Sequence, residues 1–137
     1  HRNHDEIQLW VDYLSGAPYI EDDSGRAGGL HADASFVVMG DLNADPDDPS
    51  SFRSAIRALV GHERVNGAVV PTAGRQNGDS DLDPEDTSRW AARIDYVLPS
   101  ANLTVQEARV WRPRPAWVPD VPVSDHFPVW IDVRIGP

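Results

Sequence analysis

Three clusters of acidic and polar residues each adjoin a short apolar run, and this arrangement constrains the fold of the 137-residue chain more than any other feature. Apolar runs of this length, bounded by polar residues, are typical of strands that pack in a sheet. The clusters are residues 40–43 after the run 36–39, Asp95 within the run 94–98, and residues 124–126 before the alternating run 129–135. The pattern predicts strands that carry polar groups at or near their ends.

Two segments between these runs have the periodicity of amphipathic helices. Asn3 and Glu6 resemble a capping box at the start of the first segment. We expect Ser50 or Ser51 to cap the N-terminus of the second helical segment. The apolar stripe of the first helix comprises Ile7, Trp10, Val11 and Leu14. That of the second comprises Phe52, Ile56, Leu59 and Val60.

The remaining segments complete a mixed α/β order. The run 36–39 is continuously apolar, so we expect a strand that is buried on both faces. Residues 74–89 are polar and poorly periodic, which predicts an exposed loop. A further strand is expected to end at Val110 and Trp111, and the proline-rich stretch 113–122 to be irregular. The predicted order is therefore helix, strand, helix, strand, strand, strand.

The composition excludes some classes of site. The chain has 22 acidic and 12 basic residues, a formal net charge of -10. An acidic molecule repels polyphosphate backbones, so binding of long nucleic acid is disfavoured, although the sequence leaves nucleic acid open as a substrate. Cysteine is absent, which excludes disulfides, thiolate metal ligands and cysteine nucleophiles. No apolar stretch reaches the length of about 18 residues that indicates a transmembrane segment.

Each polar cluster also has a structural interpretation when it is taken alone. An Asp-x-Asn sequence after glycine is a common turn, Asp95 suits an exposed position on an edge strand, and residues 124–126 suit an ordinary polar loop. The segments 41–52 and 79–90 imitate the start of EF-hand loops, but they lack the required Gly and Glu. Loose cation binding by these acidic segments stays open. Consecutive Ser, Asp and His residues cannot form a serine triad without partners elsewhere.

Taken together, the three clusters resemble the C-terminal half of the endonuclease/exonuclease/phosphatase superfamily, which has the deoxyribonuclease-I-like fold. The family motifs Gly-Asp-(Leu/Phe)-Asn, Arg-(Ile/Leu/Val)-Asp-Tyr and Ser-Asp-His correspond in order to residues 40–43, 93–96 and 124–126. Residues 1–16 also resemble the helix that precedes the first motif in bacterial members. The resemblance implies that residues 1–137 are the C-terminal half of one such domain, without its N-terminal half. The implied fold is half of a four-layer α/β sandwich, with mainly antiparallel or mixed sheets and flanking helices.

The resemblance implies a metal-dependent phosphoester hydrolase and a role for each matched residue. Asp41 and Asn43 would orient the attacking water and help to hold the metal-bound phosphate. Asp125 would ligate the divalent cation together with these two residues. His126 would hydrogen-bond a phosphate oxygen, and Asp95 would orient its ring. Mg²⁺ is the expected ion, with Mn²⁺ or Ca²⁺ as alternatives, because carboxylate and amide oxygens suit hard cations.

The resemblance also predicts that part of the site is missing. Family members carry an Asn and a metal-binding Glu in their N-terminal half, and no residue of this chain corresponds to them. We therefore expect weak metal binding, no useful turnover by the chain alone, and a partner that is the N-terminal half of the domain or a second copy. Two alternatives stay open, a non-catalytic binding or interaction module that retains the half-fold and an enzyme completed by another chain. The substrate is not indicated, and export is an expectation that rests on the bacterial members.

Overall fold

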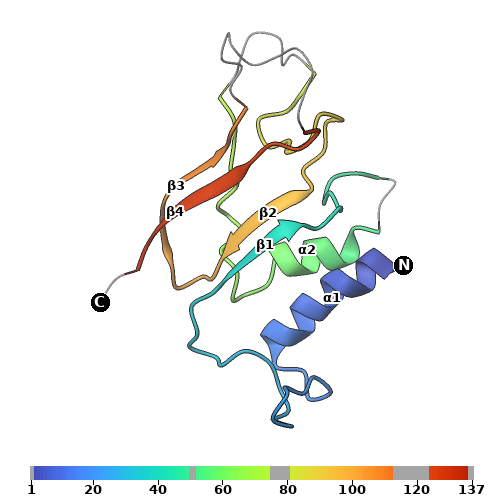
Figure 1. Ribbon diagram of the computed structural model, residues 1–137, viewed down its shortest axis with the longest axis vertical. Helices are drawn as coiled ribbons and strands as arrows, with labels where there is room; N and C mark the ends of the chain where they lie inside the picture. Colours follow the sequence, from blue (N-terminus) through green and yellow to red (C-terminus); the bar gives the residue numbers. More distant parts are fainter. Residues whose placement is uncertain (1, 50–51, 75–80, 113–123, 136–137) are drawn as a thin grey trace.

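In the computed structural model, two α-helices lie beside two small antiparallel sheets (Figure 1). The structure describes residues 2–49, 52–74, 81–112 and 124–135. The elements are α1 (Arg2–Ser15), β1 (Val37–Asp41), α2 (Ser54–Val60), β2 (Asp95–Pro99), β3 (Thr104–Val110) and β4 (Val129–Arg134). The predicted order of helices and strands is confirmed, and the chain is a mixed α/β protein. Neither helix within these residues is long and apolar enough to cross a membrane.

Each sheet is one pair of antiparallel strands. β1 pairs with β2, and the register places Asp41 opposite Asp95 at the end of the pair. β3 pairs with β4, with an irregularity between Val105 and Glu107. Antiparallel pairing with this register brings two carboxylates that are far apart in the sequence to the same end of one sheet.

The main core lies between the helices and one face of the β1–β2 sheet. α1 and α2 both lie on the same side of this sheet (Figure 1). In α1, Ile7 and Leu14 are two turns apart and therefore face the same way, and both are buried. The other buried members of the cluster are Val38, Ala44, Ala55, Ile56, Leu59, Val65, Tyr96 and Leu98.

The helices differ from the prediction in two residues of their apolar stripes and in the cap of α2. Trp10 is 41% exposed, because α1 packs against a helix of only seven residues and buries a narrow stripe. Phe52 is 62% exposed and precedes α2, so it does not share the helical periodicity. α2 begins at Ser54 without a side-chain cap, and the serines expected to cap it, Ser50 and Ser51, lie outside the described residues.

The sheets leave apolar side chains uncovered by the described part of the chain. Val38 is 4% exposed whereas its neighbour Met39 is 70% exposed, because successive side chains of a strand point to opposite faces. Trp130 on β4 is also 40% exposed. The prediction that the run 36–39 is buried on both faces is therefore wrong at Met39, which lies on the face of the sheet away from the helices.

The segment predicted as an exposed loop is partly buried. Residues 75–80 lie outside the described residues, as does the proline-rich stretch 113–122. Residues 86–88, however, are at most 6% exposed. The buried guanidinium of Arg112 donates hydrogen bonds to carbonyl oxygens within residues 83–86 and holds this segment inside. Burial through backbone hydrogen bonds leaves no apolar periodicity in the sequence, so the pattern could not indicate it.

Candidate functional site

The start of β2 and the segment before β4 bring a carboxylate and an imidazole together. Nδ1 of His126 lies 3.1 and 2.9 Å from the two carboxylate oxygens of Asp95. Asp95 is the first residue of β2, and His126 forms an isolated antiparallel bridge with Ser88. The predicted contact between Asp95 and His126 is thus present. A carboxylate at Nδ1 holds the neutral ring in the tautomer that carries its proton there, which leaves Nε2 available to other groups.

The same contact changes the acidity of the imidazole. The hydrogen bond to Asp95 raises the pKa of His126 above its ordinary value, and partial burial of the ring opposes this effect. The charges of Asp95, Asp41 and Asp125 add to the increase in pKa. The charged imidazolium is therefore favoured, and in that form both ring nitrogens are hydrogen-bond donors.

We expect the stability that this pair contributes to decline as pH rises. The folded-state pKa of His126 lies above its unfolded value of about 6.5, so the contribution is complete below that pH and is lost as pH rises through the folded-state pKa. Urea denaturation of the wild type and of His126→Gln, at a series of pH values, measures this effect. The difference between their free energies of unfolding should shrink with increasing pH, and a constant difference would contradict the assignment.

A tight turn after β1 sets Asp41 and Asn43 at the tip of the strand. Gly40 has a φ of +148°, a backbone conformation that L side chains rarely adopt, which explains the glycine before Asp41. The Asp41 carboxylate accepts a hydrogen bond from the backbone amide of Asn43 at 2.8 Å, and Asn43 itself has a φ of +44°. Asn is one of the few residues that tolerate this left-handed conformation. The Gly-Asp-Leu-Asn sequence thus has a local reason for its composition.

Asp41, Asp95 and His126 form a group that can hold a cation. Each offers one ligand atom, and these atoms all lie within 4.8 Å of one another. The two carboxylates suit a hard divalent ion such as Mg²⁺ or Mn²⁺, whereas an imidazole is a ligand that later transition-metal ions prefer. Of the other predicted ligands, Asn43 follows Asp41 in the turn, and Asp125 places Oδ1 4.0 Å from Nε2 of His126. The structure therefore adds Asp95 to the groups able to contribute a ligand, whereas His126 can do so only when its ring is neutral.

α1 supplies a contact to the site that sequence reasoning missed. Nδ2 of Asn3 donates hydrogen bonds to the carbonyl oxygens of Leu42 and Asn43, both at 3.1 Å. The expectation that Asn3 caps α1 is wrong, because its side chain ties the helix to the turn after β1. The partners are 39 and 40 positions away in the sequence, so no local pattern could have shown this contact.

Arg93 and Tyr96, the first and last residues of the motif 93–96, have structural roles. The Arg93 guanidinium lies 4.9 Å from the centre of the Tyr96 ring, and the Arg93 amide donates to the Asp45 carboxylate. The Tyr96 hydroxyl donates to the carbonyl oxygens of Ala44 and Arg93. Tyr96 is 2% exposed, and burial raises the pKa of its hydroxyl far above the ordinary value. Both residues therefore attach β2 to the turn after β1 and keep the tip of the sheet in place.

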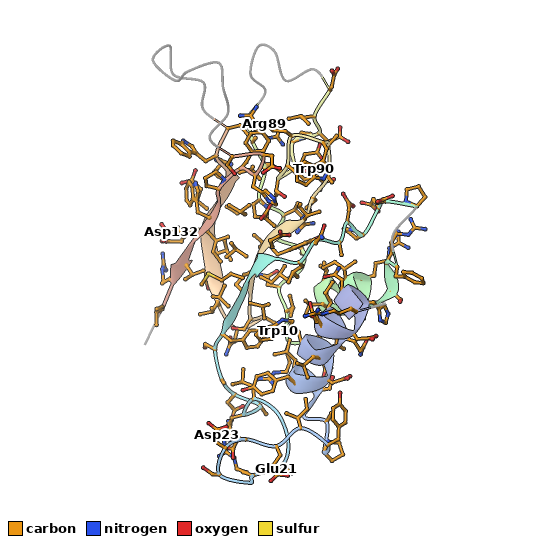
Figure 2. The ribbon with its side chains drawn as sticks, turned by 45° about the vertical axis from the view of Figure 1, so that its right-hand side comes forward. Trp10, Glu21, Asp23, Arg89, Trp90 and Asp132 are labelled. Atoms are coloured by element: carbon orange, nitrogen blue, oxygen red, sulfur yellow. The ribbon has the colours of Figure 1, made fainter. Side chains whose placement is uncertain are left out.

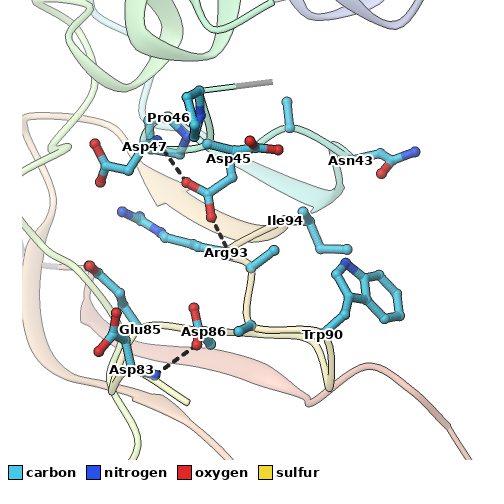
Figure 3. A pocket seen from close by; sticks show the side chains of 15 residues that line it. Asn43, Asp45, Pro46, Asp47, Asp83, Glu85, Asp86, Trp90, Arg93 and Ile94 are labelled. Carbon is cyan, nitrogen blue, oxygen red and sulfur yellow. Dashed lines mark hydrogen bonds between the residues drawn. The ribbon is translucent and has the colours of Figure 1, made fainter. Parts of the chain in front are cut away.

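A pocket of about 560 Å³ opens beside the group (Figure 3). Trp90 forms one end of this pocket, near Asn43 and Ile94. The Trp90 ring meets His126 edge to face, with 5.3 Å between ring centroids. Figure 2 shows Trp90 beside Arg89 at the end of the molecule opposite Glu21 and Asp23. The acidic residues that line the pocket are Asp45, Asp47, Asp48, Asp83, Glu85 and Asp86.

Comparison with known proteins gives one match. The sequence model of the Endonuclease/Exonuclease/phosphatase family matches residues 5–126. No curated protein and no solved structure matches the chain. The matched segment includes all five of the predicted site residues, Asp41, Asn43, Asp95, Asp125 and His126. The similarity therefore runs from α1 to the end of the candidate site.

Proposed function

We infer that this chain, which belongs to the endonuclease/exonuclease/phosphatase family, hydrolyses phosphoesters with the help of a divalent cation at the site of Asp41, Asp95 and His126. The observation that carries the proposal is the hydrogen-bonded Asp95–His126 pair, with the Asp41 carboxylate beside it at the tip of the sheet. Family membership indicates a phosphoester hydrolase, and this arrangement supplies groups that such a reaction needs.

Each side chain has a role that its position supports. His126, held by Asp95 through Nδ1, donates from Nε2 to a phosphate oxygen on which negative charge develops. Asp41 and Asn43 orient the attacking water, since both lie in the turn at the strand tip. We consider two sets of metal ligands, and Asp41 belongs to both. Asp125 and Asn43 complete the first set, and Asp95 completes the second. A cation held by these residues would supply Lewis acidity for the phosphoryl group and for a bound water.

We further propose that another polypeptide segment completes the site. The exposed apolar side chains of Met39 on β1 and Trp130 on β4 support this view, because polypeptide packed over these strands would bury them. The N-terminal half of the same domain would complete a four-layer sandwich, and a second copy of this chain is the other candidate. On this proposal the chain by itself binds cations weakly and turns over little substrate.

Metal titration tests the ligand assignment without requiring turnover. We expect Mn²⁺ to bind the chain weakly, with a dissociation constant of about 10⁻⁴–10⁻³ M, the range of the weakest protein sites for the hard cation Ca²⁺. Asp41→Asn should abolish saturable binding, whereas the exposed loop variant Asp33→Asn should bind like the wild type. Comparing Asp95→Asn with Asp125→Asn identifies the second carboxylate ligand. Unchanged binding by Asp41→Asn would contradict the site.

An activity assay tests the hydrolase proposal itself. Bis(p-nitrophenyl) phosphate is assayed with Mg²⁺ or Mn²⁺ at rising chain concentration, and also with the N-terminal half of a family member added. We expect little turnover at low concentration and metal-dependent turnover once the site is completed. Strong turnover at low concentration would refute the need for completion. Absence of turnover under every condition would count against hydrolysis.

The alternative of a non-catalytic interaction module is supported by the same exposed apolar surface. It predicts that Met39→Ser weakens association with the completing segment, while Asp41→Asn changes neither association nor any measurable reaction. The hydrolase proposal predicts instead that Asp41→Asn abolishes turnover and leaves association intact. Analytical ultracentrifugation beside the phosphoester assay separates the two functions.

A further inference from the structure

We propose that Thr87 is a positioning residue that aligns the Asp95–His126 pair. Thr87 is 1% exposed and belongs to the buried segment 86–88, which the sequence pattern did not distinguish from an exposed loop. It makes hydrogen bonds to the backbone on both sides of the pair. Its role in turnover rests on the proposed function, whereas its role in the geometry of the pair does not.

The Thr87 side chain holds the backbone from which Asp95 projects. Its Oγ1 accepts hydrogen bonds from the amides of Ile94 and Asp95, both at 2.9 Å. These amides stand at the point where β2 begins. One hydroxyl therefore sets the position of two consecutive peptide groups, including that of the residue whose carboxylate meets the imidazole.

The Thr87 backbone holds the other partner. Its carbonyl oxygen accepts a hydrogen bond from the amide of Phe127 at 2.7 Å. The next residue, Ser88, bridges His126, and the Arg89 amide donates to the carbonyl oxygen of Asp125 at 2.9 Å. The segment that begins at Thr87 therefore runs beside the chain around His126. The same residue joins the Asp95 backbone to the His126 backbone.

A small displacement at this junction has a large consequence, because a hydrogen bond between a carboxylate and an imidazole depends steeply on distance and angle. Replacement of Thr87 by valine keeps the shape of the side chain and removes the hydroxyl oxygen that accepts from the two amides. These buried amides would then shift to find other acceptors, and Asp95 would move with them. Serine keeps the hydroxyl and loses only a methyl group.

Ser88 provides a matched control. It is 0% exposed, and its hydroxyl donates to the carbonyl oxygen of Ala92, which also accepts from the backbone amides of Thr87 and Ser88. Ser88→Ala therefore changes a buried hydroxyl in the same segment without touching the amide of Asp95. A role of Thr87 in packing alone predicts that Thr87→Val and Ser88→Ala behave alike.

The experiment compares Thr87→Val, Thr87→Ser and Ser88→Ala by two measurements. Long-range ¹H–¹⁵N NMR of the neutral His126 ring reports its tautomer, and the phosphoester assay in the completed site reports kcat and KM. We expect a single tautomer with the proton on Nδ1 in the wild type, Thr87→Ser and Ser88→Ala. Thr87→Val should show a mixture of tautomers and a kcat lower by about 10–100-fold, with KM little changed.

A single Nδ1–H tautomer in folded Thr87→Val would overturn the proposal, as would a mixture of tautomers in folded Thr87→Ser or an equal effect of Ser88→Ala. Should Thr87→Val fail to fold, the tautomer of His126 in Thr87→Ser tests the proposal, because the proposal assigns the role to the hydroxyl that serine keeps. Absence of hydrolysis by the wild type would reject the proposed function, and the tautomer comparison would still test Thr87.

Discussion

Asp95→Asn should lower kcat for phosphoester hydrolysis in the completed site by about 10²–10³-fold, the range typical of a lost hydrogen-bond donor to developing negative charge. In the wild type, the Asp95 carboxylate accepts from Nδ1 of His126 at 2.9 Å and favours the charged ring. An asparagine amide carries no charge and can present either its oxygen or its nitrogen to the ring. The variant therefore loses both the raised pKa of His126 and the single tautomer.

The dependence of kcat on pH provides the measurement for this prediction. Asp132→Asn is the matched control, because Asp132 is an exposed carboxylate that projects outward from β4 (Figure 2). The control should keep the wild-type rate and pH profile. If Asp95→Asn reduces kcat no more than Asp132→Asn does, the Asp95–His126 pair has no part in the reaction.

Leu98→Ala should lower the free energy of unfolding by about 2–5 kcal/mol, as truncation of a fully buried leucine does in other cores. Leu98 is 0% exposed and lies in the core between β2 and the two helices. Alanine leaves a cavity there, because neighbouring side chains relax only in part. The same core supports the β1–β2 pair that carries Asp41 and Asp95, so the site should become unstable with it.

Urea denaturation measures this change, with Leu9→Ala as the control. Leu9 lies on α1 and is 52% exposed, so its truncation should change the free energy of unfolding by no more than about 0.5 kcal/mol. Similar losses of stability in both variants would mean that the core is not centred where the β1–β2 sheet meets the helices.

The type and order of the elements could be predicted because periodicity reports which side of a segment is buried. Ile7 and Leu14 mark the inner face of α1, and Val38 marks the covered face of β1. Periodicity failed where burial depends on what lies beyond the segment. Met39 is as apolar as its neighbours, yet its side chain is 70% exposed.

Asp41, Asp95 and His126 could be identified as candidate site residues from the sequence, because each belongs to a short motif at the end of an apolar run. That these residues meet, and which other residues hold them there, depends on how the chain folds. Asn3 and Thr87 act through hydrogen bonds to backbone groups of residues elsewhere in the chain. Every residue carries such backbone groups, so the choice of partner leaves no mark in the sequence and depends on how the folded segments come together.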